Sequence, residues 1–396
     1  MKKYMIVAAA AALCLASCAK FDTYTVSEND GNVPIGFTNY TPRPITKADT
    51  SNYVAGATLV DTAQFAVYAW SVANETYSAG VGNKTFYANA SGAPNFMNPA
   101  VVTYYGDTTD GDANTYSPLR YWPSGDVPEG LSFFAYYPYG AGRIDATVSK
   151  TAGTTPASAV SVASFDFTAE DSAAEMVDFC VSEVVNDQYY GYTNGGSYKQ
   201  TVKFTFKHQL TKVVVKFKTD NTDTSTVVTV TSAQFKKINN AATLTAYING
   251  TATTTKWGTP SGDATYDIYI PNNGVLTTTA EPATVDNDDN DQIIFLMVPQ
   301  DMLENNEADA QYIDITWTVD TYTNSEHNVL VSSTTNTKKL YLDDCTTTDG
   351  GDTGADIDWD KNMNVVYTLT VGPKPIWFTA EVTNWASETN GYFNAQ

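Results

Sequence analysis

Apolar and polar residues alternate with a period of two along much of this chain, which predicts β-strands with one buried face. Residues 293–298 are apolar on both faces and predict a central strand covered on each side. Helical periodicity is nearly absent, so the predicted fold class is all-β, built from antiparallel β-sandwiches. The clearest alternating runs have their apolar positions at Val202, Phe204 and Phe206; Ile313, Ile315, Trp317 and Val319; Val365, Tyr367, Leu369 and Val371; and Ile376, Phe378, Ala380 and Val382.

The length of 396 residues favours two tandem sandwiches. A polar stretch that contains glycine, residues 186–200, is the best boundary. We therefore predict an N-terminal β-sandwich over residues 49–200 and a C-terminal one over residues 201–396. The preceding segment, residues 18–48, stands apart: it holds one short apolar stretch, Val33–Phe37, and then the basic residues Arg43 and Lys47.

The first eighteen residues predict export. Lys2 and Lys3 precede an apolar run that is too short to span a bilayer, and the run closes on Leu-Ala-Ser-Cys. This pattern resembles a bacterial lipoprotein signal, with residues 1–17 as the signal peptide. The resemblance implies that Cys18 receives a diacylglycerol and an N-terminal acyl chain such as palmitate, which together anchor the mature chain firmly.

The net charge argues against nucleic acid as a partner. It is −22 for the full chain, and loss of the signal peptide with its two lysines makes it −24. Nucleic acid and anionic membrane surfaces repel such a chain. The acidic runs at residues 286–291 and 349–360 offer oxygen ligands for calcium, but they lack the spacing of the helix-loop-helix calcium site. We interpret them as solvated loops and predict no metal site.

Residues that could perform catalysis are scarce. The only histidines are His208, which shares the parity of a buried strand face, and His327, which lies in a polar turn. Cys180 and Cys345 lack metal-ligand spacing, and two buried free thiols are favoured over a disulfide. No catalytic or cofactor-binding motif is present. The sequence therefore predicts neither an enzyme nor a cofactor. Four tryptophans near turns leave a sugar-binding surface as a lesser alternative: Trp122, Trp257, Trp359 and Trp385.

Several strand motifs, in this order behind the lipoprotein signal, resemble the fimbrillin family, the lipoprotein pilins of Bacteroidetes. This chain has Gln209 at a position where the family often has Ala. We expect this difference to affect side-chain packing more than function. The matching motifs are Tyr121-Trp122-Pro123, Leu131 to Pro138, Phe204 to Val213, Met297-Val298-Pro299-Gln300, Asn364 to Val371, Ile376-Trp377-Phe378 and Val382 to Trp385.

The resemblance implies two stacked transthyretin-like sandwiches, exported as an outer-membrane lipoprotein to the cell surface or fimbrium. It also implies that a trypsin-like protease removes the N-terminal segment, which had filled a groove in the first domain. A strand from a neighbouring subunit then fills the groove, a form of strand addition. The implied partners are other pilin subunits, outer-membrane lipid, and ligands on host or bacterial surfaces.

Specific residues follow from this resemblance. Lys47-Ala48 is the expected cleavage site, because Arg43 precedes a proline, although the family's usual cleavage residue is Arg.

The alternative to a structural or adhesive pilus subunit is a monomeric surface glycan-binding lipoprotein of a nutrient-uptake system. The donor strand is expected at Ile376, Phe378, Ala380 and Val382, and the expected O-glycosylation sites are Thr62, Thr108 and Ser172.

Overall fold

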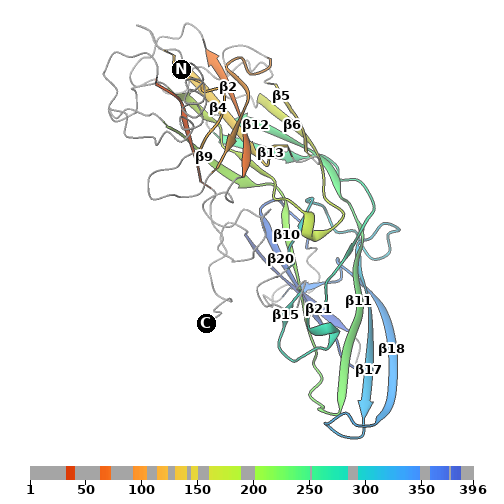
Figure 1. The fold of residues 1–396 in the computed structure, drawn as a ribbon. Helices are drawn as coiled ribbons and strands as arrows, with labels where there is room; N and C mark the ends of the chain where they lie inside the picture. Colours follow the sequence, from red (N-terminus) through yellow and green to blue (C-terminus); the bar gives the residue numbers. More distant parts are fainter. Residues whose placement is uncertain are drawn as a thin grey trace, which may run out of the picture.

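The computed structural model describes residues 33–40, 63–72, 92–104, 114–123, 130–140, 144–149, 160–188, 201–249, 252–283, 293–347, 357–373 and 376–384. Within these ranges the chain forms 21 strands in four sheets, with two short 3-10 turns, η1 (Ala173–Glu175) and η2 (Asn272–Gly274), and without an α-helix. The all-β prediction is confirmed. The sheets form two sandwiches that follow one another along an elongated molecule (Figure 1).

The N-terminal sandwich is built on a seven-stranded sheet. Its first strand, β1, pairs in parallel with β9, and the other neighbours in this sheet are antiparallel. In order across the sheet the strands are β1 (Gly36–Tyr40), β9 (Thr201–His208), β7 (Cys180–Ser182), β4 (Gly130–Tyr137), β2 (Gln64–Val72) and β3 (Met97–Thr103), and β8 (Val185–Gln188) also pairs with β4.

A four-stranded antiparallel sheet covers one face of this seven-stranded sheet. The contact is aromatic: the ring of Phe165 lies 5.1 Å from that of Tyr136, edge to face. The side chains on the opposite face of the seven-stranded sheet form a second core together with Val33, Ile35, Tyr104, Tyr116 and Trp122. The strands of the covering sheet are β13 (Ala252–Trp257), β12 (Ala241–Asn249), β6 (Val160–Thr168) and β5 (Ile144–Val148).

The C-terminal sandwich packs a mixed six-stranded sheet against a four-stranded antiparallel sheet. Phe235 of the smaller sheet contacts Phe295 and Tyr367 of the larger one, with ring centroids 5.3 and 6.4 Å apart. The larger sheet contains β15 (Glu281–Pro282), β10 (Thr211–Lys218), β20 (Met363–Thr370), β21 (Trp377–Asn384), β19 (Thr346–Thr347) and β16 (Phe295–Met297); the smaller contains β14 (Ala264–Asp267), β11 (Thr226–Ile238), β17 (Tyr312–Tyr322) and β18 (Leu330–Tyr341).

Strand pairing crosses position 200, the boundary expected from the sequence. β9 and the hairpin β12–β13 lie C-terminal of residue 200, yet they pair with β1, β7 and β6, which precede it. Between β9 and β14 the chain therefore crosses from one sandwich to the other three times. Position 200 therefore falls between β8 and β9, two strands of the same seven-stranded sheet, and not between the two sandwiches.

The predicted burial of the alternating strands agrees with the structure except at Val319, which is half-buried, and at Val382, which is 38% exposed. The inward residues of β9, Val202, Phe204 and Phe206, are all buried, and residues 293–298 are buried on both faces. Alternation identifies such strands because it places every second side chain on the same face.

Candidate functional site

The N-terminal strand β1 and the residue before it occupy a slot within the first sandwich. β9 lines one side of this slot in parallel register, from Gly36 opposite Thr201 to Tyr40 opposite Thr205. On the other side, the Ile35 backbone amide donates to the Arg120 carbonyl at 2.9 Å. The Trp122 amide donates to the Val33 carbonyl, also at 2.9 Å. We call this space the β1 slot: it is bordered by β9 and residues 120–122.

The alternate side chains of the segment point into the second core. Val33, Ile35 and Phe37 are only 4%, 1% and 1% exposed. The Phe37 ring packs against Tyr116, Phe133 and Phe204, with centroids 5.2, 6.0 and 5.8 Å away. Fully burying an aliphatic or aromatic side chain contributes about 1.5–3 kcal/mol. The three residues together therefore contribute roughly 5–9 kcal/mol, as an upper estimate.

Two side chains that line the β1 slot donate hydrogen bonds to main-chain carbonyls of the segment in it. The Tyr116 hydroxyl donates to the Ile35 carbonyl at 2.9 Å, and the Asn114 side-chain amide donates to the Phe37 carbonyl at 2.7 Å. Burial raises the pKa of Tyr116, so this hydroxyl keeps its proton at neutral pH and stays a donor. The segment 33–37 is thus held by main-chain pairing, by hydrogen bonds from side chains and by apolar contacts.

The expected donor strand is β21, and it lies within the C-terminal sandwich. It pairs antiparallel with β20 from Met363 opposite Asn384 to Thr370 opposite Trp377, and β19 flanks its other edge. Ile376, Phe378 and Ala380 are buried there, whereas Val382 is 38% exposed. The structure therefore places Ile376, Phe378 and Ala380 in the core of the same chain.

The other residues predicted from the sequence are distributed as follows. Ser172 lies half-buried in the turn that precedes η1. Of the expected sugar-stacking residues, Trp122 and Trp359 are buried in the cores and Trp257 is half-buried. Cys18, Arg43, Lys47, Thr62, Thr108 and Trp385 lie outside the described residues.

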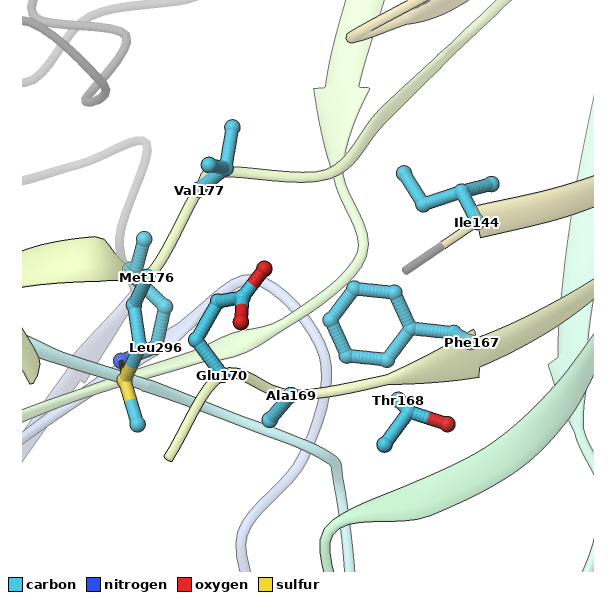
Figure 2. A pocket seen from close by; sticks show the side chains of 8 residues that line it. All are labelled: Ile144, Phe167, Thr168, Ala169, Glu170, Met176, Val177 and Leu296. Atoms are coloured by element: carbon cyan, nitrogen blue, oxygen red, sulfur yellow. Dashed lines mark hydrogen bonds between the residues drawn. The ribbon is translucent and has the colours of Figure 1, made fainter. Parts of the chain in front are cut away.

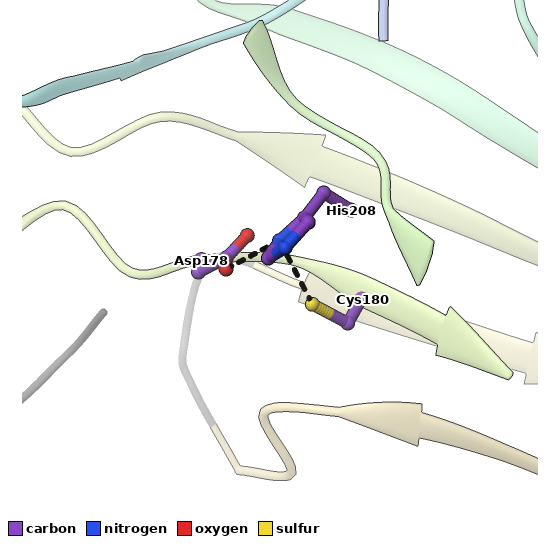
Figure 3. A group of neighbouring side chains, drawn as sticks. All are labelled: Asp178, Cys180 and His208. Atoms are coloured by element: carbon purple, nitrogen blue, oxygen red, sulfur yellow. Dashed lines mark hydrogen bonds and ion pairs between the residues drawn. The ribbon is translucent and has the colours of Figure 1, made fainter. Parts of the chain in front are cut away.

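The two histidines lie in contrasting environments. His327 is exposed in the β17–β18 turn, where its Nε2 lies 3.1 Å from the Thr224 carbonyl oxygen. His208 is buried at the end of β9, and its Nδ1 lies 2.8 Å from Asp178 Oδ2 and 3.6 Å from Cys180 Sγ (Figure 3). Asp178 and Cys180 are also buried.

This Asp178–Cys180–His208 cluster, which sequence reasoning missed, does not have the environment of a catalytic thiol. Burial, and the nearby Asp178 carboxylate, raise the pKa of Cys180 well above its ordinary value. Reactive cysteines instead have a lowered pKa and partial exposure. The signal in the sequence was Asp-x-Cys, which places both side chains on one side of an extended segment. The register that sets Cys180 opposite His208 could not be read from it.

Cys345 is likewise a buried thiol that is not part of a disulfide, and burial raises its pKa to about 12. A small apolar hollow lies at the seam between the sandwiches, where Phe167 and Met176 of the first approach Leu296 of the second (Figure 2). Its lining carries one acidic side chain, Glu170, so it offers few polar groups to orient a ligand.

In the described part of the chain, helices of the length and apolarity needed to cross a bilayer are absent. The fold defines a protein of two β-sandwiches whose first sheet is completed by an N-terminal strand. The chain belongs to the fimbrillin-like family, whose sequence model matches residues 46–385.

The solved structures that align with this chain include proteins from Bacteroides and Porphyromonas species. A fimbrial protein from Bacteroides vulgatus aligns with a TM-score of 0.55 and 20% identity, over 89% of this chain and 99% of that one. A protein from Bacteroides uniformis assigned to cell adhesion aligns with a TM-score of 0.45 and 14% identity, over 90% of this chain and 100% of that one. The tip fimbrial protein Mfa3 from Porphyromonas gingivalis, with a C-terminal truncation, aligns with a TM-score of 0.37 and 8% identity, over 85% of this chain and 97% of that one. A comparison with curated proteins finds no match.

Proposed function

We propose that this chain is a structural or adhesive pilus subunit without catalytic activity, exported as an outer-membrane lipoprotein anchored through Cys18. In this proposal, cleavage after Lys47 frees the segment that fills the β1 slot. A strand from a neighbouring subunit then takes its place. The observation that carries the proposal is β1 itself: an N-terminal strand, buried on one face, that is followed in sequence by basic residues suited to a trypsin-like protease.

The β1 slot has the properties that strand exchange requires. Main-chain groups of β9 and of residues 120–122 supply the pairing, and the core accepts apolar side chains at every second position. Without a strand, the rings of Phe133 and Phe204 lose the cover of Phe37 and the edge of β9 loses its partner. Both changes favour the capture of a new strand. The family match, which begins at residue 46, also leaves β1 outside the shared region.

The C-terminal strand β21 is our candidate donor, because Ile376, Phe378 and Ala380 repeat the alternate apolar spacing of Val33, Ile35 and Phe37. Donation has a cost. β21 must leave its pairing with β20, so its own sandwich loses buried side chains at the same time. Exchange in a filament therefore needs a neighbour's slot to replace those contacts.

Limited trypsin treatment of the full chain tests the processing step. We expect N-terminal sequencing to find Ala48 as the new end and electron microscopy to show filaments after cleavage. Lys47→Gln should block both, while the matched control Arg43→Gln should leave both intact. Cleaved protein that stays monomeric and binds polysaccharide would favour the glycan-binding alternative, although the burial of Trp122 and Trp359 supports the pilus subunit.

A peptide experiment tests the donor separately from the folding of its sandwich. A labelled peptide of residues 376–384 should bind the cleaved protein and not the uncleaved one. The same peptide with Asp at the positions of Ile376 and Phe378 should fail to bind, because the slot accepts apolar side chains. Equal binding of both peptides would remove β21 as the donor and leave the processing step standing.

Ser172 is the one proposed O-glycosylation site within the described residues, and its turn is half-exposed. Thr62 and Thr108, which lie outside the described residues, are the other two proposed O-glycosylation sites. Mass spectrometry of protein purified from its native host should find sugar on these hydroxyls, and unmodified peptides at all three would reject it.

A further inference from the structure

We propose that Asp178, Cys180 and His208 form a zinc-binding site inside the N-terminal sandwich. Strand geometry brings them together. Asp178 and Cys180 are two residues apart in an extended segment, so their side chains project to the same side. His208 lies directly opposite Cys180 in the antiparallel pairing of β7 with β9. Figure 3 shows the three side chains turned toward one another.

The distance between His208 and Cys180 already fits a zinc ion. Zinc binds imidazole nitrogen and carboxylate oxygen at about 2.0 Å and thiolate sulfur at about 2.3 Å, so a tetrahedral site holds nitrogen and sulfur about 3.5 Å apart. The observed distance between His208 Nδ1 and Cys180 Sγ is 3.6 Å. The distance between Nδ1 and Asp178 Oδ2, 2.8 Å, has to widen by roughly half an ångström for tetrahedral coordination.

Asp178 supplies the second observation that points to a cation. Its side chain is fully buried, and Oδ1 has no hydrogen-bond partner among the residues that the structure describes. A buried carboxylate oxygen that is left unsatisfied carries a desolvation cost. If the carboxylate binds a cation through both oxygens, Oδ1 gains a partner and the site gains a fourth ligand atom.

Charge balance favours a divalent ion. An aspartate, a cysteine thiolate and a neutral imidazole carry two negative charges together, so one Zn²⁺ makes the buried site neutral. Binding transfers the thiol proton of Cys180 to solvent. The proton of neutral His208 moves from Nδ1, where it bonds to the Asp178 carboxylate in the metal-free protein, to Nε2, and Nδ1 then binds the ion. A thiolate together with an imidazole selects zinc over magnesium or calcium, which prefer oxygen ligands.

The burial of all three ligands determines when the ion binds. Zinc has to enter before β7 and β9 close over the site, so folding and metal loading are coupled. The bound ion would then clamp β7 to β9, the strand that pairs with β1. This inference does not depend on the proposed pilus function.

The test uses the full chain, made without a polyhistidine tag and refolded from denaturant with ZnCl₂, with MgCl₂ or with EDTA. We expect about one zinc per chain by elemental analysis after extensive dialysis, and a higher unfolding midpoint only for the sample refolded with zinc. Cobalt(II) in place of zinc should give a thiolate charge-transfer band.

Matched variants assign the ligands. Cys180→Ser and His208→Asn should lose the metal and the cobalt band, whereas Cys345→Ser and His327→Asn, which change the other buried thiol and the other histidine, should keep both. If Cys180→Ser fails to fold, the persistence of the cobalt band in a chain with Cys14, Cys18 and Cys345 all replaced by serine still identifies Cys180 as the thiolate. Refolded wild-type protein that contains no zinc, or zinc that survives both ligand variants, would overturn the proposal and leave a buried hydrogen-bonded cluster.

Discussion

Replacing Phe37 by alanine tests how strongly the β1 slot holds its strand. The ring is 1% exposed and contacts three aromatic rings. A buried Phe→Ala substitution costs about 3–5 kcal/mol, because transfer free energy is lost and a cavity is left. If this cost falls on the docking of β1, the affinity of the slot for the cleaved segment falls by about 10²- to 10⁴-fold.

The assay follows release of the segment after cleavage at Lys47. A fluorophore on the N-terminal segment reports its dissociation, and urea denaturation of the uncleaved protein gives the accompanying loss of stability. Val329→Ala is the matched control, because this side chain is 58% exposed and its truncation should change stability by less than about 0.5 kcal/mol. Release of the Phe37→Ala segment at the rate of the unsubstituted segment would refute the reasoning.

Three further predictions concern single contacts. Tyr116→Phe removes the hydroxyl that donates to the Ile35 carbonyl, and it should weaken docking of the segment by about 1 kcal/mol in the same release assay; an unchanged rate would show that water replaces the bond. Burial in the folded protein raises the pKa of the Cys345 thiol from 9.0 to about 12. The unfolded chain therefore loses its proton first, and stability should fall as pH rises through this window by up to about 1.4 kcal/mol per pH unit. In urea titrations at several pH values, Cys345→Ala should make the free energy of unfolding depend less steeply on pH in this window. An unchanged pH dependence would contradict this prediction. Gly274→Ala should destabilise the protein by at least about 1–3 kcal/mol in thermal unfolding, because φ is +88° and the added Cβ would overlap the Val230 carbonyl oxygen; a variant as stable as the parent would count against it.

The sequence predicted the strands and their buried faces better than the way in which they pair. Alternation of Val202, Phe204 and Phe206 specifies which face of β9 is buried, but it contains no information on its neighbours. The pairing with β1 and β7 is set by contacts between residues far apart in the chain. For this reason the polar composition of residues 186–200 suggested a boundary that strand pairing does not follow.

For the candidate site, too, the sequence predicted local patterns but not contacts between residues far apart in the chain. Val33, Ile35 and Phe37 stood out as one short apolar stretch ahead of two basic residues, and that local pattern was enough to single out the segment. The Asp178–Cys180–His208 cluster was not visible, because its members come from two strands whose register depends on the whole sheet. The sequence did indicate that His208 lies on a buried face, since it shares the parity of Phe204 and Phe206.

The three crossings of the chain between the sandwiches have a mechanical consequence. Two domains joined by a single linker can swivel, and a pull on the ends strains only that linker. Here β9–β10, β11–β12 and β13–β14 each connect one sandwich to the other, so bending at the seam deforms three backbone connections at once. Three connections at one seam therefore resist bending and swivelling more strongly than a single linker does.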